Sequence, residues 1–187
     1  MSLVFQYGSN CNAARLNDAE RLAGAAIERG RAETIDEYDI VFDVWSQKNG
    51  CAASDLILMP GTGRHAWGAL YDVPDDRLRG NRADGVKTLE QIEGPRYQER
   101  TIRVRDPENK EIEAVTFLVR PADRRSNLWT SVDYVRHIVK GLRLNDAPEE
   151  YVQHVIDVAI ETNRQSATAA EEQTRLIVGL RATDFSQ

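Results

Sequence analysis

A strand that breaks into a tight turn within the first ten residues is the feature that most constrains this chain. Residues 3–7 have the sequence Leu-Val-Phe-Gln-Tyr and suit a buried, pleated surface. Gly8, Ser9 and Asn10 follow at once; glycine takes positive φ without penalty, and serine and asparagine favour tight turns. Such a turn sets backbone N–H groups at the end of a sheet, where they can bind an anion or a developing oxyanion. An ordinary first strand and turn is the alternative.

Length and composition predict one globular domain with a full core. The chain has 187 residues and a net charge of −6, which argues against a nucleic-acid-binding protein because phosphate binding needs a basic surface. No apolar run approaches the roughly 20 residues of a membrane helix. The first residues lack a basic segment and a cleavage site, so we expect no membrane partner and no signal peptide.

The spacing of histidines and cysteines predicts neither a metal site nor an organic cofactor. The three histidines are scattered, and Cys11 and Cys51 form no CxxC pair. We therefore expect free thiols in a reducing cytoplasm. Cys11, just past the turn, is a candidate nucleophile, but a small residue packing behind the loop is the better interpretation.

Periodicity predicts an α+β domain with a closed or half-closed sheet. The expected helices cover residues 17–30, 78–93 in two pieces, 131–142, 148–159 and 171–180. The expected strands include residues 32–45, 67–73 and a hairpin within 97–119. Because residues 166–170 are small and polar, we expect one domain over residues 1–165 and a C-terminal helical extension and tail over residues 166–187.

Glu93 is expected in an unfavourable setting for a carboxylate. It shares a helix face with apolar side chains, and Gly94 ends the helix. The negative end of the helix dipole and desolvation both raise a carboxyl pKa there, which suits a proton shuttle. A surface Glu93 paired with Arg96 or Arg100 is the alternative.

Three stretches, taken in order, resemble the γ-glutamyl cyclotransferase family. They are Tyr-Gly-Ser-Asn at residues 7–10, Ala-Trp-Gly-Ala-Leu-Tyr-Asp-Val at residues 66–73, and Leu-Glu-Gln-Ile-Glu-Gly at residues 89–94 followed by Tyr97. The resemblance covers residues 3–155 and implies a small mixed β-barrel surrounded by helices.

The resemblance also implies a reaction and its residues. The α-amino group of a γ-glutamyl unit attacks its own side-chain carbonyl, 5-oxoproline forms and the attached amine leaves. Glu93 would be the general acid and base. The implied substrate-binding residues are Tyr7, Gly8, Ser9, Asn10 and Tyr97.

The chain departs from the family pattern at two positions, and several alternatives stay open. Tyr97 follows Gly94 more closely than in animal members, and Cys11 stands where Leu or Met is usual. Glu90, one turn earlier, is the rival base. Arg15 would attract an anionic substrate or lie solvated at a helix start.

The expected partner is a small-molecule γ-glutamyl substrate, with homodimer formation left open. Asn10 favours γ-glutamyl dipeptides, since enzymes acting on glutathione carry Leu there. A glutathione-directed enzyme and a non-catalytic binding or interaction protein of the same fold are the alternatives.

Overall fold

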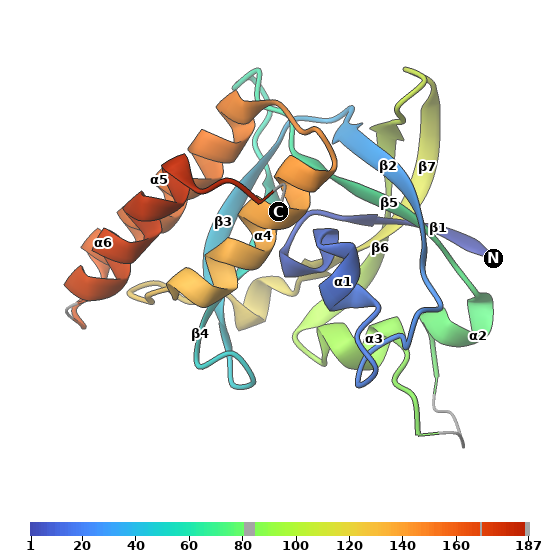
Figure 1. The fold of residues 1–187 in the computed structure, drawn as a ribbon, viewed down its shortest axis with the longest axis horizontal. Helices are drawn as coiled ribbons and strands as arrows, with labels where there is room; N and C mark the ends of the chain where they lie inside the picture. Colours follow the sequence, from blue (N-terminus) through green and yellow to red (C-terminus); the bar gives the residue numbers. More distant parts are fainter. Residues whose placement is uncertain (81–84, 169, 186–187) are drawn as a thin grey trace.

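The computed structural model describes residues 1–80, 85–168 and 170–185 and contains a closed five-stranded barrel beside a small second sheet (Figure 1). The barrel order is β1 (Ser2–Gln6), β5 (Trp67–Val73), β2 (Ile27–Thr34), β6 (Tyr97–Arg105) and β7 (Glu111–Val119). Neighbouring strands are antiparallel, except that β1 and β7 are parallel where they close the barrel. The strands β3 (Tyr38–Ser46) and β4 (Cys51–Leu58) form a separate antiparallel pair. The expected α+β class with a small mixed barrel is confirmed.

The longer helices lie together on one flank of the barrel, and short helices lie near its end (Figure 1). The longer ones are α4 (Val132–Leu144), α5 (Glu149–Gln165) and α6 (Glu171–Gly179). The short ones are α1 (Ala13–Leu16), α2 (Asp75–Leu78) and α3 (Leu89–Glu93), with 3₁₀ turns at Ser9–Cys11, Pro121–Asp123 and Leu180–Ala182. In the described residues no helix has the length and apolar character needed to cross a membrane.

The C-terminal segment packs on the rest of the molecule. Helix α6 contacts α4 and α5, and Ile177 and Leu180 join the buried core. The boundary between residues 165 and 166 stays a prediction.

Gly68 explains how β1 and β5 meet inside the barrel. A Cβ at this position would lie 2.3 Å from the Gln6 carbonyl oxygen and 2.9 Å from the Phe5 ring. Phe5 is fully buried, and its carbonyl oxygen accepts a 2.9 Å hydrogen bond from Thr116 Oγ1 of β7. Glycine at position 68 therefore leaves room in β5 for the ring of Phe5.

Residues 17–30 do not form the helix that their apolar spacing predicts. The side chain of Asn17 makes two 2.9 Å hydrogen bonds to the backbone of Ala26, one as donor and one as acceptor. Ala23 and Gly24 both have positive φ, 49° and 81°, so a helix that began at Asn17 could not continue through them. The segment is a pinned loop that leads into β2.

Two other expected elements differ in the structure. The strand expected over residues 32–45 is divided between β2 and β3. Of the helix expected over residues 78–93, residues 79–80 and 85–88 are not helical, and residues 81–84 lie outside the described residues. Helix α3 begins later than expected because Thr88 forms a capping box with Gln91.

Candidate active site

The turn after β1 is pressed against β4, and Gly8 is the residue that this contact requires. A Cβ at position 8 would lie 2.5 Å from Ser54 Oγ. The backbone of Gly8 is extended, with φ −90° and ψ −152°, so the turn does not use the positive φ that glycine permits. The amide of Cys11 donates to the Gly8 carbonyl at 2.9 Å and closes the turn. Crowding rather than backbone strain accounts for glycine here.

Two distant elements support this turn from behind. Tyr71 of β5 donates a 3.0 Å hydrogen bond from its hydroxyl to the Cys11 carbonyl. Gly141 lets α4 approach, since a Cβ there would lie 2.5 Å from the Asn12 nitrogen. The Cys11 thiol is fully buried, and burial raises its pKa far above the range of a reactive thiolate. Cys11 therefore packs behind the loop rather than acting as a nucleophile.

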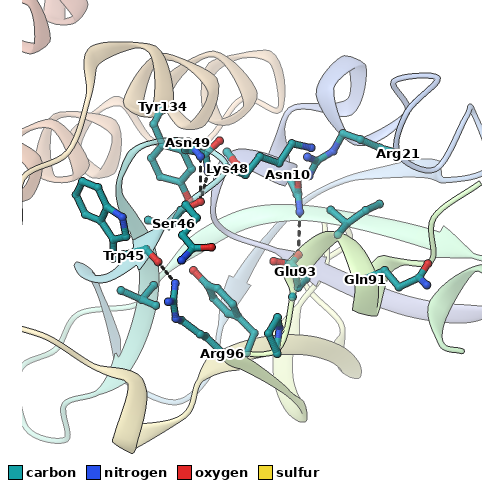
Figure 2. A pocket seen from close by; sticks show the side chains of 18 of the residues that line it. Asn10, Arg21, Trp45, Ser46, Lys48, Asn49, Gln91, Glu93, Arg96 and Tyr134 are labelled. Atoms are coloured by element: carbon teal, nitrogen blue, oxygen red, sulfur yellow. Dashed lines mark hydrogen bonds between the residues drawn. The ribbon is translucent and has the colours of Figure 1, made fainter. Parts of the chain in front are cut away.

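The side chain of Glu93 meets the turn from the other side (Figure 2). Helix α3 ends at Glu93, where Gly94 takes φ 86° and donates its amide to the Glu90 carbonyl at 2.9 Å. Asn10 Nδ2 donates a 2.8 Å hydrogen bond to Glu93 Oε1. Glu90, the rival base, is exposed and accepts from the Gly80 amide at 3.2 Å. The structure thus places Glu93, and not Glu90, beside residues 7–10.

Opposing influences act on the Glu93 carboxyl. Burial raises its pKa, while the hydrogen bond from Asn10, the charges of Arg21 and Arg15, and the side chain of Gln6 lower it. Arg21 Nη2 also donates to Asn10 Oδ1, so one amide connects the guanidinium to the carboxylate. Burial is the largest of these influences, so the pKa of the Glu93 carboxyl lies above its usual value.

Arg21 was not anticipated from the sequence. It is only 7% exposed and lines the same cavity as Glu93. Its position follows from the loop that Asn17 pins, and the periodicity of residues 17–30 carries no sign of that loop.

Two tyrosines hold β4 to the site through Ser54. Tyr97, the first residue of β6, donates to the Ser54 carbonyl at 2.7 Å. Tyr134 of α4 accepts from the Ser54 amide at 3.1 Å and lies 3.1 Å from its hydroxyl oxygen. Burial raises the pKa of both phenols, so both stay protonated. The sequence does not single out Tyr134, because it lies on the apolar stripe of α4, where an aromatic residue suggests only core packing.

Tyr7 lies deeper than the rest of the turn. Its hydroxyl donates to the Phe117 carbonyl at 2.7 Å and lies 3.5 Å from Asp55 Oδ1. It lines a small inner cavity with Gly8. Neither residue lines the larger cavity, whereas Ser9, Asn10, Glu93 and Tyr97 line both.

The larger of these two cavities, called the active-site cavity below, has a volume of about 380 Å³, enough for a small molecule. Glu93 is the one carboxylate among the described residues that line it. The cationic residues in the lining are Arg15, Arg21, Lys48 and Arg96. No group of three or more potential metal ligands comes together within the described ranges.

Comparison with known proteins places this geometry in context. Residues 65–155, which include Glu93, Tyr97 and Tyr134, match the AIG2-like family. A solved structure named gamma-glutamyl cyclotransferase aligns with a TM-score of 0.69 and 21% identity over 95% of this chain and 98% of its own. The chain has a γ-glutamyl cyclotransferase-like fold.

Other solved structures share this γ-glutamyl cyclotransferase-like fold. An uncharacterized protein from Homo sapiens aligns at 24% identity with a TM-score of 0.69, again over 95% of this chain and 98% of its own. YkqA from Bacillus subtilis aligns at 19% identity with a TM-score of 0.66, over 88% of this chain and 55% of its own. Curated proteins gave no match.

Proposed function

We propose that this protein is a γ-glutamyl cyclotransferase-type enzyme. It converts a γ-glutamyl amino acid or peptide to 5-oxoproline and releases the attached amine. The observation that carries the proposal is the Glu93 carboxylate, which lies 2.8 Å from Asn10 of the turn after β1 and lines a cavity of substrate size together with that residue. The fold likeness and the AIG2-like match support the same reading.

Glu93 performs the first proton transfer in this proposal. The α-ammonium group of the substrate must lose a proton, because a protonated amine is not a nucleophile. Its proton goes to Glu93, whose pKa burial raises toward the range useful for a base. The freed amine nitrogen then attacks the side-chain carbonyl carbon of the same glutamyl unit, and the five-membered ring forms.

The turn and the protonated Glu93 complete the reaction. The carbonyl oxygen becomes an oxyanion beside the turn, and within the described part of the chain the Gly8 amide donates to no acceptor. Such a donor stabilises the oxyanion. Glu93 returns the proton to the leaving nitrogen as its bond to the carbonyl carbon breaks. The ionised Glu93 then takes the second proton from the ring nitrogen, which becomes the neutral lactam N–H, and passes it to the released amine. The residues of this chain supply every proton transfer, so we expect no metal or cofactor requirement.

We also expect a cytoplasmic location. Cys11 and Cys51 are both free and buried, as in proteins of a reducing compartment.

The test is release of 5-oxoproline from γ-glutamyl-alanine, glutathione and a γ-glutamyl amine by the wild type, Glu93→Gln and Glu90→Gln. Glutamine keeps the shape of Glu93 and still accepts from Asn10, but it cannot take the ammonium proton. We expect Glu93→Gln to lower kcat by roughly 10²–10⁴-fold, with a smaller change in KM. Glu90→Gln, in the same helix, is the matched control and should turn over normally.

Two outcomes would overturn the proposal. Near-normal turnover by a well-folded Glu93→Gln protein would remove Glu93 as the base. Binding of γ-glutamyl compounds by the wild type without any 5-oxoproline would instead indicate a binding protein of this fold.

A further inference from the structure

A further cavity, here called the second cavity, shares part of its lining with the active-site cavity. It has a volume of about 480 Å³, and Arg15, Arg21 and Lys48 line both cavities. Arg136 and Lys140 of α4 extend the lining outward. These five cations, from the shared wall to α4, are here called the basic shelf.

The basic shelf concentrates positive charge on a chain whose net charge is −6. Asp18 and Glu20 are the only carboxylates that accompany it in the described lining of the second cavity. Arg15, Arg21 and Lys48 form no ion pair with any described carboxylate. Their charge is therefore available to an anion from outside the protein.

The two arginines of the shared wall also hold buried nitrogens without acceptors. Arg21 uses Nη2 on Asn10, and Arg15 uses Nη2 on Asn49 at 3.1 Å. The Nε atoms of both are buried, and neither has a hydrogen-bond partner among the described residues. A buried donor without an acceptor is costly, so native structures rarely leave one unless a ligand or water completes it.

The crowding of like charges is visible in neighbouring groups. Burial, with the charges of Arg21, Lys87 and Arg15, lowers the pKa of Lys48. Burial and the charges of Arg15 and Arg21 lower the pKa of His137, which lines the second cavity, to about 4. Figure 2 shows Lys48 reaching toward Arg21 and Asn10. Bringing an anion to this place relieves the repulsion.

We propose that the basic shelf binds carboxylates on the leaving amine, so that the enzyme prefers γ-glutamyl compounds with an anionic leaving part. The inference rests on the proposed function. Asn10 touches both Glu93, where the substrate ammonium is handled, and Arg21, where the shelf begins. A carboxylate on the leaving amine reaches Arg15, Arg21 and Lys48, and a second carboxylate reaches Arg136 and Lys140.

The experiment compares three substrates with the same γ-glutamyl unit: γ-glutamyl-glutamate, γ-glutamyl-alanine and γ-glutamyl-propylamine. Their leaving parts carry two, one and no carboxylates. We expect kcat/KM to fall in that order, by about tenfold for each carboxylate lost, since hydrogen bonds to charged groups are worth that much. The differences should shrink as salt is added.

Lysine variants test the two parts of the shelf. Lys48→Gln should lower kcat/KM for both anionic substrates relative to γ-glutamyl-propylamine. Lys140→Gln should lower it for γ-glutamyl-glutamate relative to γ-glutamyl-alanine. Lys110→Gln, in the exposed turn between β6 and β7, removes the same charge elsewhere and should leave these ratios unchanged.

Calorimetric binding of the same compounds separates failure of the shelf from failure of the proposed function. Equal kcat/KM for the three substrates, or equal effects of Lys48→Gln and Lys110→Gln, would overturn the shelf and leave the cyclotransferase intact. No 5-oxoproline from any substrate, together with tighter binding of γ-glutamyl-glutamate that Lys48→Gln weakens, would support the shelf and overturn the enzyme. Neither turnover nor preferential binding would overturn both.

Discussion

At the scale of single residues, Asn10 links the two opposite charges of the site through one side-chain amide. Its nitrogen donates to Glu93 at 2.8 Å, and its oxygen accepts from Arg21. Reversing the amide would set donor against donor and acceptor against acceptor, so the two partners fix its orientation. The hydrogen bond to Glu93 favours the ionised carboxylate, which is the form that the proposed mechanism requires as proton acceptor.

Asn10→Ala should therefore change the pH dependence of turnover. Burial raises the pKa of Glu93 and the Asn10 hydrogen bond lowers it, so removing Asn10 raises that pKa further. The acidic limb of kcat/KM, below which Glu93 is protonated, should move to higher pH. Measuring kcat/KM from pH 4 to 9 checks this. An acidic limb at the wild-type position would contradict the role assigned to Asn10.

At the scale of elements, the turn after β1 is held by three neighbours that are distant in sequence. Ser54 of β4 presses on Gly8, Tyr71 of β5 holds the Cys11 carbonyl, and Gly141 lets α4 close over Asn12. These contacts fix the backbone groups of the turn without any ligand, as the proposed role in oxyanion stabilisation requires.

Gly8→Ala tests whether that contact positions the turn. The added methyl group would lie 2.5 Å from Ser54 Oγ, so the turn or β4 must shift. We expect turnover to fall by about tenfold or more and the melting temperature to drop by several degrees.

The double variant Gly8→Ala with Ser54→Ala supplies the control. Removing the Ser54 hydroxyl leaves its Cβ 3.9 Å from the added methyl group, an ordinary contact. The double variant should melt higher than Gly8→Ala alone. Equal melting temperatures for the two proteins would show that the contact with Ser54 is not the cause.

The elements that the sequence predicts well are those defined by their own periodicity. The hairpin of β6 and β7, helices α4 and α5 and the helix end at Glu93 all follow from local patterns and stop signals. Residues 17–30 do not, because two hydrogen bonds from Asn17 outweigh a helical spacing of apolar side chains. Because that loop is not predicted, the position of Arg21 is not predicted either. Arg21 is the residue of the basic shelf that is connected to Glu93 through Asn10.

At the scale of the whole molecule, one buried carboxylate joins the small sheet to the barrel. Asp55 of β4 is fully buried. Its Oδ1 accepts from the Val119 amide of β7 at 2.9 Å, and its Oδ2 pairs with Arg124 at 2.6 Å. Ser54, which both active-site tyrosines contact, is the neighbouring residue. Docking of the two sheets therefore sets the geometry of the site.

This junction predicts a pH dependence of stability. Burial raises the pKa of Asp55 from 3.8 to about 6, despite the Val119 amide and Arg124, which lower it. Between these values the folded protein holds a proton that the unfolded chain has released. The contribution of Asp55 is thus fully present below pH 3.8 and is lost as pH rises through about 6. The loss amounts to about 3 kcal/mol at most.

Asp55→Asn isolates this contribution, since asparagine does not titrate. Between pH 4 and pH 7 the free energy of unfolding of the wild type should fall relative to that of Asp55→Asn, because only the wild type must ionise a buried carboxyl group. Urea denaturation at half-unit pH steps measures the difference. Asp133→Asn, which changes an exposed aspartate on α4, serves as the control for loss of one acidic group. A constant difference between wild type and Asp55→Asn across that range would mean that Asp55 is already ionised in the folded protein. Arg124 would then hold the junction as a charged pair.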